Sequence, residues 1–286
     1  SRNADIDDAV NRAPGANDDG SGVAAILELA RVFSQFTFES TVMFVAFTGE
    51  EEGLFGSRAL AADLKASNVN VVGMVTNDII GNVVGGSGQV DSLSVRCFSD
   101  NPSDSPHRQL ARYMKLQGEA YLPGFTVRLI ARRDRPGRGG DHFAFNEQGY
   151  TAARLTEPED NLNHQHNMDD LPEFMSFPYL TKVVKVNAAY LASWADAPES
   201  PTNVRLTPQG GQQLLSWDKN AEAGLSYLVA FRGPESASYD SLVAVAAETQ
   251  VALDPAPLPD GVFISVSGVD AEGNESVFSQ EVVLRK

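Results

Sequence analysis

The sequence predicts an α/β domain with a mostly parallel, mixed sheet flanked by helices, followed by a small all-β sandwich. Two apolar runs rich in β-branched and aromatic residues, 41–48 and 69–78, are typical of strands covered on both faces. A helical pattern lies between them, so strand, helix and strand alternate as in a parallel sheet. The pattern changes near residue 200, where short strands follow one another between turn residues. We therefore expect one domain over 1–197 and a second over 198–286.

Four helices are expected in the first domain. The helix over 22–33 has a single apolar face formed by Val23, Ile26, Leu27, Ala30 and Phe33. Later helices are expected over 56–67, 106–118 and 177–196, the second of which starts at Pro106 and ends at Gly118. The last and longest helix closes the domain.

Composition limits the kinds of partner. The 286 residues carry a net charge of −16, which disfavours nucleic acid or an anionic membrane as a partner and favours cations. No apolar run approaches the roughly 18 residues of a membrane span. The one cysteine, Cys97, excludes an internal disulfide and a cysteine-rich zinc site, and is expected to be a buried strand residue.

Acidic residues follow the predicted strands. Asp18 and Asp19 lie in a glycine-flanked turn where the first helix begins, 50–52 is a run of three glutamates after the first strand, and Asp78 ends the second strand. In open α/β sheets, sites form at the carboxyl ends of strands, so these carboxylates are expected to converge. Their mutual repulsion is relieved by a divalent cation.

Histidine selects among the possible metals. Three of the four histidines, His142, His164 and His166, fall in one late segment. Mixed Asp, Glu and His ligation indicates zinc, and a glutamate beside a ligand glutamate supplies the general base that metal-assisted hydrolysis needs.

Four ordered motifs resemble a known family. "GANDDGSG", "FVAFTGEEEGLFGS", "TNDIIGN" and the histidine-rich late segment are similar to the di-zinc exopeptidases of clan MH, over residues 1 to 196. That family includes secreted bacterial aminopeptidases, glutamate carboxypeptidases and glutaminyl cyclases. The resemblance implies a role for each acid, a cis peptide after the bridging aspartate, and two zinc ions. The implied residues are Asp18 as the bridging ligand, Glu50 as general base, Glu51, Asp78 and His166 as ligands with His164 as the competing histidine, and Asp19 as a structural residue.

One family ligand is expected upstream of this sequence. The family carries a His-x-Asp pair 10 to 20 residues before the bridging aspartate, and no histidine precedes Asp18 here. The resemblance therefore implies an N-terminally truncated chain that binds about one zinc tightly and has little or no peptidase activity. The intact parent is expected to bind two zinc ions and to hydrolyse peptides.

Further residues are expected around the site. Asp141 is expected to support the site, His142 to cap a helix or line the pocket, and the acidic run 157–160 to lie in a loop at its mouth. Gln165 stands where some family members use a tyrosine to hold the oxyanion. Arg154 or Tyr150 are alternative donors for that role.

The resemblance favours aminopeptidase action on peptides, with three alternatives. A carboxypeptidase would use the basic cluster Arg132, Arg133, Arg135 and Arg138, and a glutaminyl cyclase would use a single zinc. In the third alternative the protein is a non-catalytic binding protein that docks to a surface or partner through its C-terminal domain. That domain resembles fibronectin type III modules through Trp217, Tyr227 and the "SVSGVDAEGNES" ending. The family implies an extracellular or periplasmic location.

Overall fold

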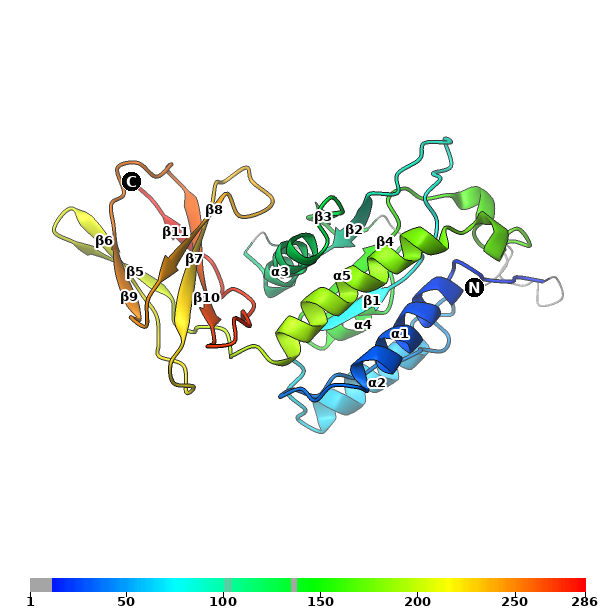
Figure 1. Ribbon diagram of the computed structural model, residues 1–286, viewed down its shortest axis with the longest axis horizontal. Helices are drawn as coiled ribbons and strands as arrows, with labels where there is room; N and C mark the ends of the chain where they lie inside the picture. The colour runs from blue at the N-terminus through cyan, green and yellow to red at the C-terminus, as the bar shows by residue number, and fades with distance from the viewer. Residues whose placement is uncertain (1–11, 101, 103, 135–137) are drawn as a thin grey trace.

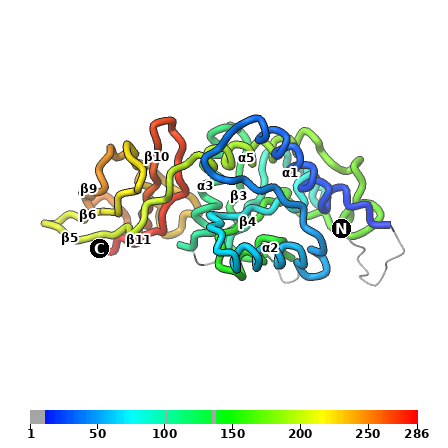
Figure 2. Tube along the Cα trace, turned by 90° about the horizontal axis from the view of Figure 1, so that it is seen from below, coloured from blue at the N-terminus to red at the C-terminus, as the bar shows by residue number. Residues whose placement is uncertain are grey.

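The computed structural model describes residues 12–100, 102, 104–134 and 138–286, and it contains an α/β part and a β part (Figure 1). The two parts lie at opposite ends of the long axis in both views (Figures 1 and 2). The helices are α1 Gly20–Phe33, α2 Phe55–Ala66, α3 Pro106–Tyr121, α4 His142–Glu147 and α5 Phe177–Ala195, with short 3₁₀ turns at Leu162–His164 and Pro172–Phe174. The strands of the α/β part are β1 Met74–Asn77, β2 Ser94–Phe98, β3 Thr126–Ile130 and β4 Ala152–Thr156.

The sheet of the α/β part has the order β1-β4-β2-β3. β1 runs parallel to β4 and β2 runs parallel to β3, whereas β2 and β4 are antiparallel. The expected α/β class with a mostly parallel, mixed sheet is confirmed for the described strands, since two of the three pairings are parallel and one is antiparallel. The strand expected over 69–78 is shorter, because only 74–77 pairs with a neighbour.

Helices cover both faces of this sheet. On one face, α1, α3 and α5 form the main core with residues such as Ala25, Leu110 and Val183. On the other, α2 and α4 pack through Ala61 and Phe145. The four helices expected from the sequence are confirmed, each within three residues at its ends.

The buried face of α1 differs from the expected one. Its buried positions include Ala25, Leu29 and Phe33, while Leu27 is 65% exposed. Val23 and Ile26 line a cavity at the edge of the sheet instead of packing into the core. The expected face was wrong because the helix is turned toward α5 and β1.

The expected strand over 41–48 is also corrected. Segment 41–47 has no regular secondary structure and packs against helices of both faces, since Phe44 contacts Phe33 of α1 and Phe47 contacts Phe145 of α4. Within the described part of the chain it pairs with no strand, and β1 is the edge of the sheet. A strand requires a hydrogen-bonding partner, which an apolar pattern alone does not supply.

Two cavities occupy the gap between segment 41–47 and β1. An apolar one of about 280 Å³ and an acidic one of about 380 Å³ share lining residues on both walls, among them Val45, Phe47, Met74 and Val75. They form one continuous gap, which we call the edge gap, and its acidic end reaches the carboxyl end of β1.

The β part contains two antiparallel sheets. Their strands are β5 Arg205–Gln209, β6 Gln212–Ser216, β7 Ser226–Arg232, β8 Ser241–Val245, β9 Gln250–Leu253, β10 Val262–Val269 and β11 Val282–Leu284. One sheet has the order β11-β10-β7-β8 and the other β5-β6-β9. Trp217 and Tyr227 pack edge to face in the shared core, with ring centroids 5.1 Å apart.

Buried charge joins the β part to α3. Glu281 accepts two hydrogen bonds of 2.8 Å from Arg232 and lies 3.3 Å from Arg112 of α3. All three side chains are at most 3% exposed. Gln117 of α3 also donates to Glu275 at 3.1 Å. Since buried charges are tolerated only when paired, this contact fixes the β part against α3.

Removing the charge of Glu281 is therefore expected to be strongly destabilising. Glu281→Gln leaves two buried guanidinium groups without their carboxylate, and we expect a loss of about 3–5 kcal/mol in the free energy of unfolding. Urea denaturation measures this loss. The matched control is Asp218→Asn. Asp218 lies 3.4 Å from Arg205, and both side chains are about half exposed, so the loss in the free energy of unfolding should stay below about 1 kcal/mol. Equal small losses in both variants would contradict the prediction.

Within the described residues, no helix combines the length and the apolar character needed to cross a bilayer.

Candidate metal centre

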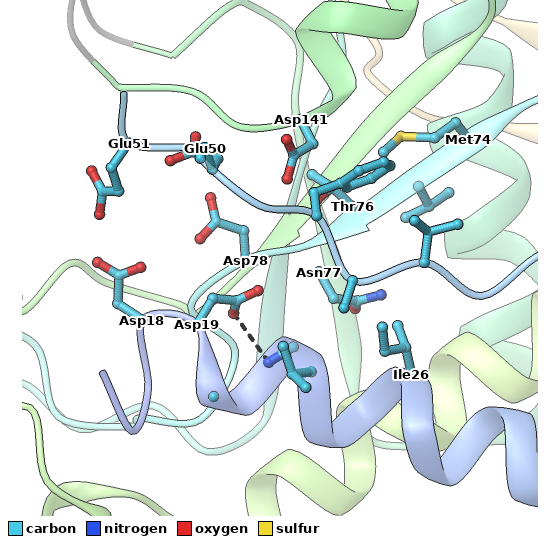
Figure 3. Close-up of a pocket in the computed structure, with 18 of the residues that line it drawn as sticks. Asp18, Asp19, Ile26, Glu50, Glu51, Met74, Thr76, Asn77, Asp78 and Asp141 are labelled. Carbon is cyan, nitrogen blue, oxygen red and sulfur yellow. Dashed lines mark hydrogen bonds between the residues drawn. The ribbon is translucent and has the colours of Figure 1, made fainter. Parts of the chain in front are cut away.

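The acidic side chains meet at the carboxyl end of β1, as predicted (Figure 3). Asp18 lies in the turn before α1, Glu50 and Glu51 follow segment 41–47, and Asp78 follows β1 directly. Asp141, at the start of α4, points into the same cavity. The expectation that these carboxylates converge is confirmed.

Three potential metal ligands form one cluster. Nε2 of His166 lies 2.9 Å from Oδ2 of Asp18 and 2.8 Å from Oε1 of Glu51. The three ligand atoms all lie within 4.8 Å of one another, and among the described residues this is the one such cluster of His, Cys, Asp and Glu. Asp18 is buried, and Glu51 and His166 are partly accessible.

This cluster suits zinc. Tetrahedral ligands at about 2.0–2.1 Å from zinc are separated by roughly 3.3 Å, so Nε2 of His166 needs to move away from each carboxylate oxygen by only about half an ångström. An Asp, Glu and His set is the donor chemistry of catalytic zinc sites, which keep a fourth position open. Asp18, Glu51 and His166 would hold the ion.

The turn that carries Asp18 is fixed by its neighbours. Asp170 accepts hydrogen bonds from the backbone N–H groups of Asn17 (2.7 Å) and Asp18 (3.0 Å). The Asp18–Asp19 peptide bond is cis, as the resemblance implies. Asp19 accepts from the N–H of Gly22 at 3.0 Å and of Ile79 at 3.2 Å, so it caps α1 and joins it to the loop after β1.

Gly22 allows this close approach. A Cβ atom at that position would lie 2.1 Å from the carbonyl oxygen of Asn77 and 2.5 Å from the Asp19 carboxylate. Only glycine lets the first turn of α1 contact β1 so closely. The double-aspartate turn between glycines is thus explained by packing at the sheet edge as well as by charge.

The carboxyl group of Glu50 has a raised pKa. Burial and the negative charges of Asp78, Glu51 and Asp141 raise its pKa to about 8. A carboxyl group with a pKa near the working pH can both take and return a proton. The other two glutamates of the run have different environments. Glu51 contacts His166, and Glu52 is exposed.

Asp78 has a cationic partner. Arg154, whose side chain is 2% exposed, lies 3.0 Å from Asp78 and 3.4 Å from Asp134. Burial raises the pKa of Asp78 to about 6, and the charge of Arg154 opposes that rise. Asp78 therefore lies at the site but outside the cluster of Asp18, Glu51 and His166.

The other expected site residues have varied surroundings. The ring of His142 is buried against Phe143, with centroids 4.2 Å apart. His164 stacks on Phe174 at 3.9 Å, so the choice of His166 over His164 agrees with the geometry. Arg135 lies outside the described residues.

Gln165 makes contacts of its own beside His166. Its Oε1 accepts from Arg138 at 3.0 Å and its Nε2 donates to Glu157 at 3.4 Å. Tyr150 donates to the carbonyl of Val69 at 3.3 Å. The amide of Gln165 and the hydroxyl of Tyr150 are thus already engaged in hydrogen bonds.

Sequence reasoning missed the buried Glu157. The run 157–160 was expected at the mouth of the site, but the side chain of Glu157 is fully buried behind it, and burial raises its pKa to about 8. Its position directly after β4, parallel to β1, is the signal that could have found it, because Asp78 occupies the same place after β1.

Zinc binding is expected to release protons. Hydrogen bonds to Asp18 and Glu51 raise the pKa of His166 to about 9, so the imidazole is charged at pH 7 and must lose its proton to bind a metal. Apparent zinc affinity should therefore rise with pH, by up to about tenfold per unit, until pH 9. Calorimetric titrations in two buffers of different ionisation enthalpy count the protons released. An affinity that does not change between pH 7 and 9 would contradict this.

Comparisons with known proteins agree with this geometry. The sequence profile of peptidase family M28 matches residues 7–191. A probable zinc metalloprotease of Leptosphaeria maculans is 36% identical over 307 aligned residues, covering 96% of this chain and 70% of the relative. One of Pyrenophora tritici-repentis is also 36% identical, and the match covers 96% of this chain and 63% of that relative.

Solved structures show the same fold. The aminopeptidase from Aneurinibacillus sp. strain AM-1 superposes with a TM-score of 0.54 at 27% identity, covering 65% of this chain and 41% of that one. The Legionella pneumophila LapA aminopeptidase gives a TM-score of 0.54 at 28% identity, covering 64% and 48%. The chain thus spans only part of the length of these relatives. Together with the cluster of Asp18, Glu51 and His166, these matches show that the chain belongs to peptidase family M28, a family of zinc metallopeptidases.

Proposed function

We propose that the protein is a zinc-dependent exopeptidase that removes N-terminal residues from peptides. The observation that carries the proposal is the convergence of Asp18, Glu51 and His166 within 4.8 Å, beside a glutamate with a raised pKa. When bound, zinc polarises the scissile carbonyl and lowers the pKa of the attacking water. Glu50 takes the proton from that water and delivers it to the leaving amine.

The charge of the cavity favours a free amino terminus as the group recognised. Asp19, Asp78 and Asp141 line the cavity together with Glu50. Such a pocket attracts the α-ammonium group of a peptide and repels a terminal carboxylate. The two aminopeptidase structures that share the fold support the same specificity.

Arg138 supports a second candidate, a metallocarboxypeptidase. Its guanidinium donates to Gln165 beside His166, and its charge acts on Asp18 and Asp78. A guanidinium group so placed could bind a substrate carboxylate. The other described arginines of the basic cluster are engaged elsewhere, Arg132 near Asp134 and Arg133 near Asp100.

A panel of blocked dipeptides separates the two candidates. An aminopeptidase cleaves dipeptides amidated at the C-terminus and fails on N-acetylated ones, and a carboxypeptidase shows the reverse. We expect an enzyme with a complete metal centre to cleave the C-blocked set, and to lose this activity in the presence of a zinc chelator. Cleavage of N-acetylated substrates alone would refute the aminopeptidase assignment.

The edge gap supports the further proposal of a co-catalytic zinc pair in the intact enzyme. The gap lies between segment 41–47 and β1, and its acidic end opens beside Asp18 and Asp78. An additional strand in this gap would pair with the open edge of β1 and could present a ligand between these two aspartates. Without that ligand, the described residues offer the second site only carboxylates, and Asp78 is already paired with Arg154.

Zinc stoichiometry tests this arrangement. For the 286-residue chain we expect one zinc ion bound tightly at Asp18, Glu51 and His166, and little peptidase activity. Calorimetric titration with zinc gives the number of sites, and two tight sites in this chain would show that no further ligand is needed.

We also propose that the β part is a fibronectin type III-like module and that the protein is exported. The two antiparallel sheets and the packed pair Trp217 and Tyr227 support the first point. Export rests on the family resemblance, and fractionation of producing cells tests it.

A further inference from the structure

We infer that Glu157 is a positioning residue that fixes the two loops carrying Asp18 and His166, an inference that rests on the proposed zinc site. Glu157 is the first residue after β4, at the same edge of the sheet as Asp78. Its side chain is fully buried, and it is not among the residues that line the acidic cavity. It therefore acts through other residues and not on the substrate.

The carboxylate of Glu157 joins two distant segments. Its Oε2 accepts a hydrogen bond from Nδ2 of Asn17 at 2.7 Å, and its Oε1 accepts one from Nε2 of Gln165 at 3.4 Å. Asn17 directly precedes Asp18, and Gln165 directly precedes His166. One buried group thus holds the backbone positions next to two of the three proposed ligands.

The same network reaches the loop after β1. Oδ1 of Asn17 accepts from the N–H of Gly81 at 2.7 Å, and the N–H of Glu157 donates to the carbonyl of Ile79 at 2.7 Å. A Cβ atom at Gly81 would lie 2.7 Å from Oδ1 of Asn17, so this loop sits tightly against the Asn17 amide. The three loops at this edge are therefore held relative to one another by Asn17 and Glu157.

A carboxyl group is the group this position needs. Two amide N–H donors converge on it, one on each oxygen, and a carboxyl group can accept on both of its oxygens. A glutamine would turn its own NH₂ group toward one of these donors and leave a buried donor unpaired. Glu157→Gln is thus a nearly isosteric change that breaks one of the two connections.

Zinc affinity tests the inference. By chelator competition at pH 7, we expect Glu157→Gln to weaken zinc binding about tenfold, as is typical when a group supporting metal ligands is lost. The matched control is Glu159→Gln, the same change two residues away on a side chain that is 44% exposed, and its affinity should match that of the wild type. A wild type that binds no zinc refutes the proposed function. A folded Glu157→Gln that binds zinc as tightly as the wild type refutes this inference alone.

A double-mutant cycle separates positioning from a general effect on folding. A purely structural role lowers the melting temperature of the zinc-free protein and leaves zinc affinity unchanged. Because Glu157→Ala removes both connections, adding Asn17→Ala to it should cost less zinc affinity than Asn17→Ala costs in the wild type. Fully additive losses would overturn the inference.

If Glu157→Gln does not fold, Gln165→Met serves in its place. It removes one of the two donors and leaves the buried carboxylate bound to Asn17. We expect a several-fold loss of zinc affinity, and unchanged affinity would overturn the inference.

Discussion

Glu50→Gln is expected to abolish peptide turnover by the active enzyme while leaving zinc binding intact. General acid–base catalysis contributes about 10²–10⁴-fold to rate, and an amide cannot accept the proton of the attacking water. The change is nearly isosteric and lies outside the cluster of Asp18, Glu51 and His166, so the metal site keeps its ligands. Dipeptide hydrolysis and a parallel zinc titration measure the two effects separately.

Glu52, two residues after Glu50, provides the matched control. It belongs to the same run of three glutamates, but it is exposed where it lines the acidic cavity. Glu52→Gln should retain activity within a few-fold of the wild type. Retained turnover in Glu50→Gln, or equal losses in both variants, would remove Glu50 from the mechanism.

His166→Ala is expected to have the largest effect on zinc binding. Structural zinc sites in small peptides are worth about 10–16 kcal/mol over four ligands, so one ligand accounts for roughly 3 kcal/mol, or about a hundredfold in affinity. The loss also leaves Asp18 and Glu51 facing each other without the imidazole between them. Chelator competition measures the affinity of the purified protein.

His164→Ala is the control for that experiment. It makes the same change two residues earlier, on a ring that stacks against Phe174 and not against the acidic cluster. Its zinc affinity should equal that of the wild type. If His164→Ala were the damaging variant and His166→Ala harmless, the assignment of the late ligand would be wrong.

Most of the metal centre could be predicted because its residues follow secondary structure in a regular way. Asp18 precedes a helix, and Asp78 follows a strand, so topology alone brings them to one edge. Only the family resemblance could assign different roles to Glu50 and Glu51, since periodicity does not distinguish one glutamate of the run from its neighbours. The choice of His166 over His164 rests on the same source.

The predictions of a strand over 41–48 and of the buried face of α1 were wrong because tertiary packing determines both. Segment 41–48 has the composition of a buried strand, yet a strand also needs a paired neighbour, and the sequence pattern cannot show whether one is present. The apolar residues Val23 and Ile26 of α1 face the edge gap for the same reason.

The contacts that the buried residues Glu157 and Arg154 make at the site could not be predicted from the sequence. Glu157 lies in a run of acids that reads as a solvated loop, and its burial depends on Asn17, 140 residues away in sequence. The pairing of Arg154 with Asp78 likewise depends on the parallel register of β1 and β4.

Anomalous diffraction at the zinc edge, from crystals grown with zinc, tests the central claim most directly. We predict a strong peak about 2.0–2.2 Å from a carboxylate oxygen of Asp18, a carboxylate oxygen of Glu51 and Nε2 of His166. A zinc peak elsewhere, with His166 still hydrogen-bonded to both carboxylates, would contradict the account.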